Sequence, residues 1–321
     1  MLSRLPYRHH ASSSFFYMKH HFFSSITTTS TSPISSSSSP SSSPVSDNIR
    51  TILHDLKASE HFDLIVVGSG PAAQKCAINS SKKGKKVAII DKRAMFGGVC
   101  VHTGTIPSKT FREAILHLTA YRHKGFYGDA YSQTRNIEME DILDRVKKVE
   151  FAEMDIIRNQ LMRNGIHLIH GSARFLEANT LAVLDDKVAG KESATDAQRH
   201  NTANVCQRVL TADQFLIAVG TRPARREDIP FDGETIFDSD QILWGGVKSI
   251  PKQLIVVGAG VIGMEYASMI NIIPGTQVTV IDSRKEILDM ADKEVSDALC
   301  YAMRQSGARF LTEETIKSVE V

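Results

Sequence analysis

The sequence predicts an α/β protein that contains two units of the same kind. One pattern begins near residue 62 and again near residue 254: an apolar run, a glycine-rich turn, a helical segment and a second apolar run that ends in aspartate. Continuous apolar runs are typical of strands covered on both faces in a parallel sheet. The chain has 321 residues, of which 42% are hydrophobic and 23% charged, an ordinary balance for a globular protein with room for two domains.

The first pattern starts with a strand expected over 62–67, which runs directly into a G-x-G-x-x-A turn. The defined positions of this turn are Gly68, Gly70 and Ala73. Gly68 permits the tight turn, Gly70 lets the backbone approach a diphosphate, and Ala73 is small enough for the following helix to pack on the strand. The helix then presents free N–H groups and the positive end of its dipole to the phosphates.

The end of this first pattern supports the same interpretation. The helix is expected to stop at Gly84, and a strand over 86–90 closes with Asp91, which lies 23 positions after Gly68. An acid about 20 residues beyond the first glycine commonly binds the adenosine ribose hydroxyls. The combination predicts a dinucleotide site, and the alternative is a glycine turn without a ligand.

The second pattern has the same parts as the first: a strand, a glycine-rich turn, a helix and a strand that ends in aspartate. A strand over 254–257 leads into G-x-G-x-x-G, a helix is expected through Ile270, and a strand over 277–281 ends at Asp282, 24 positions after the first glycine. The glycines are Gly258, Gly260 and Gly263. Two dinucleotide sites in one chain suit an enzyme that passes electrons between a bound flavin and a nicotinamide.

The remaining segments are expected to complete the two sheets. Apolar residues at helical spacing over 139–163, followed by Asn-Gly, predict a long helix. Strands are expected over 166–169, 180–184 and 309–311, with a buried strand over 215–220 and a surface loop over 186–204.

The stretch from Gly97 to Lys109 resembles a redox motif that has lost a thiol. It contains Cys100, but Thr105 stands where a C-x-x-x-x-C motif has its second cysteine. A hydroxyl cannot form a disulfide, so this stretch cannot carry out dithiol-disulfide exchange.

Taken in order, these motifs resemble those of the two-dinucleotide flavoprotein disulfide reductases. The resemblance covers residues 61–321 and rests on both fingerprints, the Gly97–Lys109 stretch, the Ile-Ala-Val-Gly-Thr-Arg-Pro segment at 217–223, and Glu265 behind the second fingerprint. It implies two Rossmann-like domains, an FAD domain over 47–247 and the N-terminal part of an NAD(P) domain over 248–321. It also implies hydride transfer to and from flavin N5.

Within that family, the Cys-then-Thr arrangement is similar to the soluble (Si-specific) NAD(P)+ transhydrogenases, as is the segment over 231–240. This resemblance implies that NADPH reduces FAD and that NAD+ then takes the hydride. The alternatives are a dihydrolipoamide dehydrogenase-like reductase, which Thr105 disfavours, and a truncated flavoprotein without activity.

The resemblance also implies roles for particular residues. Lys109, paired with Glu265, would lie near flavin N5 and favour the anionic reduced flavin; the alternative is an ordinary surface lysine. Cys100 is a catalytic candidate, although a small residue packed on the flavin is the better interpretation. FAD is expected at Gly68, Gly70, Ala73, Asp91, Gly98, Lys109 and Gly220. NAD(H) and NADP(H) are expected at Gly258, Gly260, Gly263, Asp282 and Arg284.

At the second site we expect Asp282 and Arg284 to contact different nucleotides. Asp282 would receive the ribose hydroxyls of NAD(H), and Arg284 would meet the 2′-phosphate of NADP(H). Replacing Arg284 by Ala should therefore weaken NADPH more than NADH.

Residues 1–46 contain three basic residues and no acid, are rich in Ser and Thr, and end in a Ser/Pro tract. This composition is typical of an organellar transit peptide, with the mitochondrion favoured over the plastid, and a disordered tail is the alternative. No metal site is expected among the histidines of this segment, because no fold would fix their geometry.

The sequence gives two further expectations about partners and extent. The near-neutral body calls for no nucleic acid, and no apolar run is long enough to span a membrane. Members of the resembling family continue past residue 321 with a dimerisation domain, so we expect a C-terminally truncated chain whose full-length form is a homodimer.

Overall fold

The computed structural model describes residues 15–19, 60–92, 95–120, 137–184 and 206–320, and it has the predicted α/β architecture. The chain forms two compact units. The Gly68 unit comprises residues 34–107 and 147–221, and the Gly258 unit comprises residues 1–33, 108–146 and 222–321. These units are discontinuous in sequence, so they do not follow the linear boundaries expected for the two binding domains. The assignment of cofactors to 47–247 and 248–321 stays a prediction.

The Gly68 unit is built on a six-stranded sheet with the strand order β4-β3-β2-β7-β6-β5. The strands are β2 (Glu60–Val67), β3 (Val87–Asp91), β4 (His167–His170), β5 (Ser172–Glu177), β6 (Thr180–Leu184) and β7 (Cys206–Ile217). β2 pairs in parallel with both β3 and β7, and β3 pairs in parallel with β4. β5, β6 and β7 form an antiparallel extension. The carboxyl ends of β2, β3 and β7 therefore share one edge of the sheet, next to the glycine turn.

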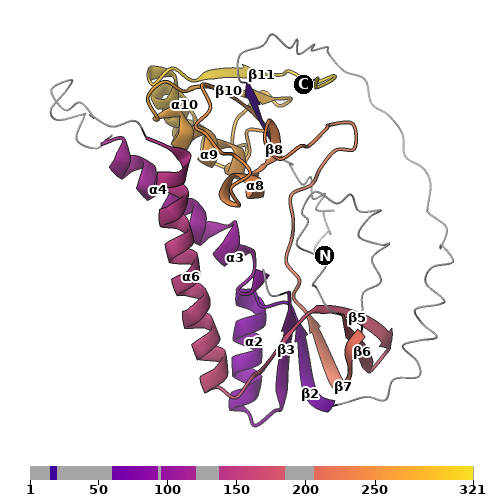
Figure 1. Cartoon of the computed structure of the whole chain (residues 1–321). Helices are drawn as coiled ribbons and strands as arrows, with labels where there is room; N and C mark the ends of the chain where they lie inside the picture. Colours follow the sequence, from indigo (N-terminus) through magenta and orange to yellow (C-terminus); the bar gives the residue numbers. More distant parts are fainter. Residues whose placement is uncertain (1–14, 20–59, 93–94, 121–136, 185–205, 321) are drawn as a thin grey trace, which may run out of the picture. The chain divides into compact units, whose positions relative to one another are not determined.

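Both faces of β2 are covered, which explains its continuous apolar sequence. Leu64 and Val66 pack with Ala73 and Ala77 of helix α2 (Pro71–Lys82), together with residues from the second half of helix α6 (Met139–Arg163). Ile65 faces the opposite cluster, which contains residues of β6 and β7. Figure 1 shows α2 running alongside β2 and β3. This packing fixes the start of α2 directly after the glycine turn.

One expectation about this unit is wrong. The segment 215–220 is not a buried strand: β7 ends at Ile217, and the side chains of Ile217 and Val219 are each 66% exposed. The physical reason is position, because these residues lie at the carboxyl edge of the sheet, where parallel strands leave the core. The stretch from Gly97 to Lys109, for which the sequence analysis assigns no secondary structure, contains α3 (Val99–His102) and the first five residues of α4 (Thr105–Leu118).

The Gly258 unit contains a five-stranded sheet with the order β11-β10-β9-β1-β8. The strands are β9 (Gln253–Val257), β10 (Gln277–Asp282), β11 (Arg309–Thr312), β1 (Phe15–Lys19) and β8 (Ile236–Asp238). β9, β10 and β11 are parallel, whereas β1 runs antiparallel to both β9 and β8. The expectation of no regular structure in 1–46 therefore does not hold for residues 15–19, whose backbone pairs with the edge of β9. Aromatic residues such as those that begin this segment favour strands.

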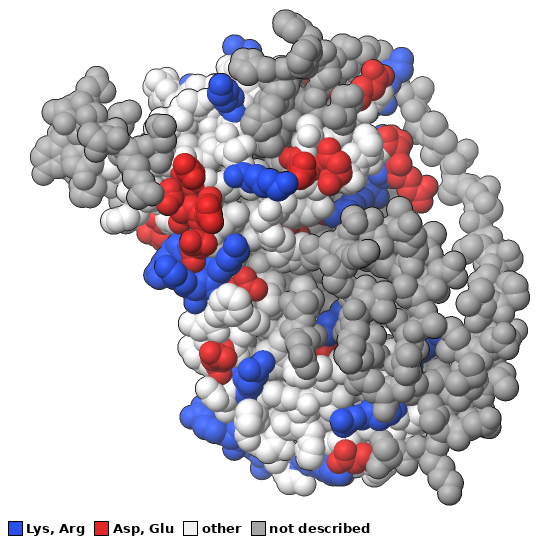
Figure 2. Space-filling model, in the orientation of Figure 1, with Lys and Arg blue, Asp and Glu red and all other residues white. Residues whose placement is uncertain are grey.

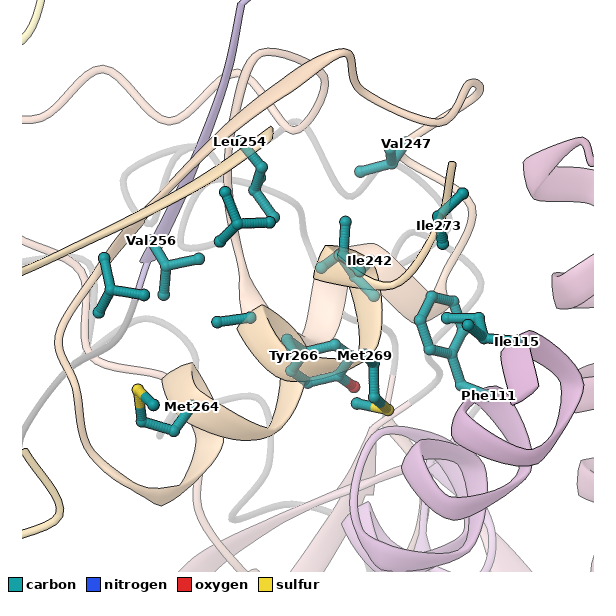
Figure 3. Close-up of a cluster of buried hydrophobic side chains, with 14 of the residues drawn as sticks. Phe111, Ile115, Ile242, Val247, Leu254, Val256, Met264, Tyr266, Met269 and Ile273 are labelled. Carbon is teal, nitrogen blue, oxygen red and sulfur yellow. The ribbon is translucent and has the colours of Figure 1, made fainter. Parts of the chain in front are cut away.

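Helix α9 (Val261–Asn271) is the central element of this unit's core. Figure 3 shows Tyr266 and Met269 of α9 directed toward Phe111 and Ile115 of α4. The rings of Tyr266 and Phe111 meet edge to face with their centroids 6.0 Å apart, a favoured aromatic geometry. Burial raises the pKa of the Tyr266 hydroxyl well above its ordinary value. The short helix α8 (Ser239–Leu243) and the longer helix α10 (Lys293–Gln305) also belong to this unit.

The segment over 231–240 owes its shape to two aspartates. Asp232 accepts hydrogen bonds from the backbone N–H groups of residues 234–236 and so closes a tight turn. Asp238 forms a capping box with Gln241 at the start of α8 and also binds the guanidinium of Arg225, with an Nη2 to Oδ2 distance of 2.6 Å. The aspartates in this part of the sequence thus have structural partners.

The described surface mixes charges of both signs. Figure 2 shows Lys and Arg interspersed with Asp and Glu in small groups on the face that it draws. Among the helices of the described residues, none has the length and apolarity needed to cross a bilayer.

The geometry of Gly68 predicts a large cost for adding a methyl group there. Its φ is +104°, and a Cβ would lie 2.2 Å from the carbonyl oxygen of Ala218. Gly84 has φ +79°, but a Cβ there would have no neighbour within 4 Å. We expect Gly84→Ala to lower the free energy of unfolding by about 1 to 2 kcal/mol, from backbone strain alone. Gly68→Ala should cost at least about 3 kcal/mol, because the backbone must also move.

Urea denaturation of the two variants and the parent chain measures this difference, with Gly84→Ala as the matched control. Equal losses for the two variants would contradict the close approach of the Gly68 turn to Ala218.

Candidate functional site

The Gly68 turn is fixed by a carboxylate at the end of the neighbouring strand. Oδ2 of Asp91, which ends β3, accepts hydrogen bonds from the backbone N–H of Ser69 (2.7 Å) and from its hydroxyl (2.5 Å). The N–H of Gly68 in turn donates to the carbonyl of Ile90 at 2.8 Å. Ser69 is fully buried. Asp91, which the sequence analysis assigns to the ribose, thus holds the turn in this structure. Its side chain remains partly exposed.

Ser69 connects this turn to the Gly97–Gly98 segment. Its hydroxyl oxygen accepts a hydrogen bond from the N–H of Gly97 at 2.8 Å. Gly98 has φ +73°, and a Cβ there would lie 2.7 Å from Cα of Gly70, so the two glycine segments are in backbone contact. Sequence reasoning singled out Gly98 but missed Ser69, because the fingerprint leaves its second position undefined.

The residues of this turn fit a dinucleotide diphosphate. A Cβ on Gly70 would have no protein atom within 4 Å, so its backbone is accessible to a ligand. Gly70 is also the N-cap of α2, whose first turn contains no acidic residue, so its N–H groups and dipole favour an anion there. Ala73 is fully buried against β2, as the fingerprint requires. Gly220, with φ +70°, follows β7 and would place a Cβ 3.9 Å from Val99, without a clash.

A buried histidine ties α3 to α6 beside this turn. The side chain of His102 is 4% exposed; its Nδ1 lies 2.5 Å from Oε1 of Glu150, and its Nε2 lies 2.9 Å from the carbonyl oxygen of Phe96. An ionised carboxylate and a carbonyl both accept hydrogen bonds, so this environment favours the imidazolium form, in which both ring nitrogens donate. Burial alone lowers the pKa of His102, but the hydrogen bonds to Glu150 and Phe96, with the charges of Glu150 and Asp91, outweigh it and raise the pKa.

The Gly258 turn repeats the arrangement of the first turn. Oδ2 of Asp282, which ends β10, accepts the backbone N–H of Ala259 at 2.6 Å. Gly258 has φ +99° and donates its N–H to the carbonyl of Ile281 at 2.9 Å. Gly260 is the N-cap of α9, and Gly263 is buried within that helix. Both fingerprints therefore fold as predicted, each with its acid bonded to the residue after the first glycine.

Arg284 lies directly on the acid of this second turn. Its Nε and Nη2 donate to Oδ1 and Oδ2 of Asp282 at 3.0 and 2.9 Å, and its Nη1 lies 2.9 Å from Oδ1 of Asp289. Burial alone raises the pKa of Asp282, but hydrogen bonds from Arg284 and Ala259 lower it overall. The hydrogen bonds to Asp282 and Asp289 raise the pKa of Arg284. Sequence reasoning identified Asp282 and Arg284 but missed Asp289, whose spacing from them carries no known signature.

Lys109 and Glu265 form an ion pair within the Gly258 unit, as the resemblance implies. Nζ of Lys109, on α4, lies 2.5 Å from Oε1 of Glu265, on α9. Their side chains are 59% and 32% exposed, so the pair is open to solvent in this structure. Lys109 is thus a surface lysine with an acidic partner, and its position relative to a flavin stays a prediction.

Cys76, Cys100 and Cys300 are free thiols. Cys100 lies within α3 and is partly exposed. Thr105 begins α4 and is exposed. The described residues contain no group of three or more His, Cys, Asp or Glu side chains placed to hold a metal. The N-terminal histidines lie outside the described residues.

These two turns define the class of protein. Each unit has a parallel β-turn-α-β arrangement whose glycine turn, helix N-terminus and terminal acid fit a dinucleotide. The model of the pyridine nucleotide-disulphide oxidoreductase family matches residues 62–321, and the chain belongs to this family.

Relatives and solved structures agree with this assignment. A soluble pyridine nucleotide transhydrogenase of Mycobacterium bovis is 45% identical over 260 residues, covering 81% of this chain and 52% of the relative. One from Chromohalobacter salexigens is 38% identical over 263 residues, covering 82% and 52%. The HOCl-induced flavoprotein disulfide reductase RclA of Escherichia coli, in a Cu(II) complex, has the same fold with a TM-score of 0.62 at 20% identity, covering 81% of this chain and 51% of that chain. The chain thus spans about half the length of the curated relatives.

The His102–Glu150 pair predicts a pH-dependent contribution to stability. Because the pKa of His102 is raised in the folded chain, this contribution is complete below the unfolded value of about 6.5 and is lost as the pH rises through the folded value. We expect Glu150→Gln to lower the free energy of unfolding by roughly 1.5 to 3 kcal/mol near pH 6 and by less at higher pH.

Urea denaturation across this pH range measures the difference between the parent chain and Glu150→Gln. Glu153→Gln, one turn away on α6, is the matched control for charge and should show no such pH trend. A Glu150→Gln effect that stayed constant with pH would contradict a protonated His102.

Proposed function

We propose that the chain carries the nucleotide-binding half of a pyridine nucleotide transhydrogenase that moves hydride between NADPH and NAD+ through FAD, without a redox disulfide. The observation that supports this most directly is Thr105 at the position of a second redox cysteine, with Cys100 as a free thiol. A disulfide-exchange reaction needs two sulfur atoms at these positions. The 45% and 38% identical relatives are named soluble pyridine nucleotide transhydrogenases, which is consistent with this proposal.

The two turns are assigned to different nucleotides in this proposal. The Gly68 turn, with Asp91, Ala73 and the adjoining Gly98 and Gly220, holds FAD, and the Gly258 turn holds NAD(H) or NADP(H). Bound FAD would supply the chemistry, because its isoalloxazine accepts a hydride from one nicotinamide and gives it to another. The residues of the chain orient the nucleotides through their phosphates and riboses. The exposed apolar side chains of Ile217 and Val219 at the carboxyl edge of the sheet suit contact with a flat aromatic ligand.

Lys109 is assigned an electrostatic role. Its ammonium group pairs with Glu265, and a positive charge placed near a reacting group stabilises negative charge that develops there. Cys100 is assigned a packing role, because it has no thiol partner within its motif and lies within a short helix. The reaction thus requires no side chain of this chain to change its oxidation state.

Two parts of the proposal concern the longer protein and its location. We infer an organellar leader in residues 1–46, with the mitochondrion favoured over the plastid, from composition; the relatives reported above are bacterial. We infer from the family resemblance alone that the full-length form is a homodimer. Import of a fusion of residues 1–46 to a fluorescent protein, and sedimentation of the full-length protein, test these two assignments.

The proposal predicts that Cys100 is dispensable for electron transfer. The purified chain should carry the visible absorption of bound FAD, and anaerobic NADPH should bleach it. Addition of thio-NAD+ should restore the absorption without any disulfide substrate. Cys100→Ser should behave within about twofold of the parent chain, because no thiol takes part.

Absorption spectra and stopped-flow traces of the parent chain and of Cys100→Ser measure the reduction and reoxidation of FAD. Cys76→Ser, which changes a thiol outside the motif, is the control for general effects of substitution. A colourless protein, or bleaching that requires Cys100 or lipoamide, would contradict the proposed function.

Arg284 should discriminate between the phosphorylated and unphosphorylated nucleotides. Because a guanidinium pairs with a phosphate through charge-assisted hydrogen bonds, Arg284→Ala should weaken NADPH by about tenfold or more. NADH should be weakened by less than about threefold, because its ribose hydroxyls meet Asp282 rather than Arg284.

Fluorescence titration of the FAD-saturated chain with each reduced nucleotide measures the two affinities. Lys285→Ala removes a neighbouring positive charge and is the matched control. Equal weakening of NADPH and NADH by Arg284→Ala would contradict this role.

A further inference from the structure

Arg284 is held by two carboxylates in this structure, and the two differ in how firmly they are fixed. Asp282 is 5% exposed and also accepts the N–H groups of Ala259 and of Arg284 itself, so its position is set by the glycine turn. Asp289 is 58% exposed and contacts only one edge of the guanidinium, through Nη1. Arg284 can therefore break its ion pair with Asp289 at a lower cost in free energy than its pair with Asp282.

The backbone places Asp289 beside the glycine turn. The preceding residue, Leu288, has φ +53° and donates its N–H to the carbonyl of Ala259 at 3.1 Å. The N–H of Ala291 donates to the carbonyl of Leu288 at 2.8 Å. A leucine in the left-handed region is unusual, and these contacts hold the segment in that conformation. The backbone that carries Asp289 is thus held near the second turn, which keeps its carboxylate within reach of Arg284.

The charges of this cluster favour a neutral ribose over a phosphorylated one. One guanidinium between two carboxylates gives a net charge of −1, and all three guanidinium nitrogens face carboxylate oxygens. A 2′-hydroxyl can bond to Asp282 without moving Arg284. A 2′-phosphate carries a charge of about −1.5 to −2 and must draw the guanidinium away from at least one carboxylate.

We propose that Asp289 is a specificity-determining residue of the second nucleotide site, where it competes with a 2′-phosphate for Arg284. This inference rests on the proposed function, because it assumes that the Gly258 turn binds an adenine nucleotide. Asp289 acts through Arg284, so it sets the preference between NAD(H) and NADP(H) and is not itself a ligand of either.

The test uses the full 321-residue chain with saturating FAD, so that the first site is filled. Isothermal titration calorimetry with 5′-AMP and with 2′,5′-ADP gives two dissociation constants whose ratio isolates the 2′-phosphate. Asp289→Asn should tighten 2′,5′-ADP by about twofold to fivefold and change 5′-AMP by less than about 1.5-fold, the size expected when one exposed ion pair no longer competes.

Two further variants decide whether the effect passes through Arg284. Asp297→Asn removes an acid that is likewise exposed and paired with a basic residue, Lys293, and its nucleotide ratio should equal that of the parent chain. Arg284→Gln retains a hydrogen bond to Asp282 without the charge. In that background Asp289→Asn should no longer tighten 2′,5′-ADP, as a double-mutant cycle requires for coupled residues.

The binding results distinguish the role of Asp289 from the proposed function on which it rests. Normal binding of both nucleotides with an unchanged ratio in Asp289→Asn would overturn the role of Asp289 alone. A gain that appears equally in Asp297→Asn, or that persists in the Arg284→Gln background, would also overturn it, since the cause would be net charge. Binding of neither nucleotide to the parent chain would overturn the proposed function and this inference together.

Discussion

The interaction on which both units depend is a carboxylate that accepts the backbone N–H next to the first glycine of the turn. Asp91 does this for Ser69, and Asp282 does it for Ala259. Charge-assisted hydrogen bonds of this kind are stronger than those between neutral groups. Each bond joins the end of one strand to the turn after its neighbour, so the start of the following helix is fixed relative to the sheet. The N-terminal N–H groups of α2 and α9 are thereby oriented before any ligand binds.

Beyond this shared bond the two turns have different surroundings. Around Asp91 the contacts extend through Ser69 to Gly97, so three separate segments of the Gly68 unit are tied together. Around Asp282 the additional partner is the charged side chain of Arg284, which is itself bound to Asp289. The first arrangement is a network of backbone and hydroxyl groups, which suits a nucleotide that stays bound. The second contains a side chain that can change partners, which suits nucleotides that exchange.

The sequence predicted those parts of the fold that short-range patterns determine. The bounds of α6 and β6 agree with the prediction to the residue, because helical periodicity followed by Asn-Gly and a short, largely apolar run are local signals. Both glycine turns and their acids were predicted for the same reason. What escaped prediction depends on contacts between distant positions. His102 and Glu150 are 48 residues apart, and no local pattern indicates that they pair.

The same distinction explains the errors. The run over 215–220 is apolar, so its sequence predicts a buried strand, yet its exposure depends on where β7 leaves the sheet. The glycines of the Gly97–Lys109 stretch do not indicate the short helix within it, in which Gly98 is the N-cap of α3 and the helical residues follow. The strand at 15–19 depends on pairing with β8 and β9, both more than 200 residues away in the sequence. A single sequence contains no signal for such pairings.

The absence of a second redox thiol changes which residue of the Gly97–Lys109 stretch matters under the proposed function. Without a disulfide, the proposed reaction uses the charge of Lys109 rather than a thiol of this stretch, and that charge is paired with Glu265 where both side chains are open to solvent. An exposed pair of this kind contributes only about 0 to 1 kcal/mol, because water screens it. Its influence on a neighbouring group grows as the local dielectric constant falls. Under this proposal the pair therefore acts mainly when bound nucleotides exclude water, and the transfer of hydride is coupled to the binding of both ligands rather than to the chemistry of a thiol.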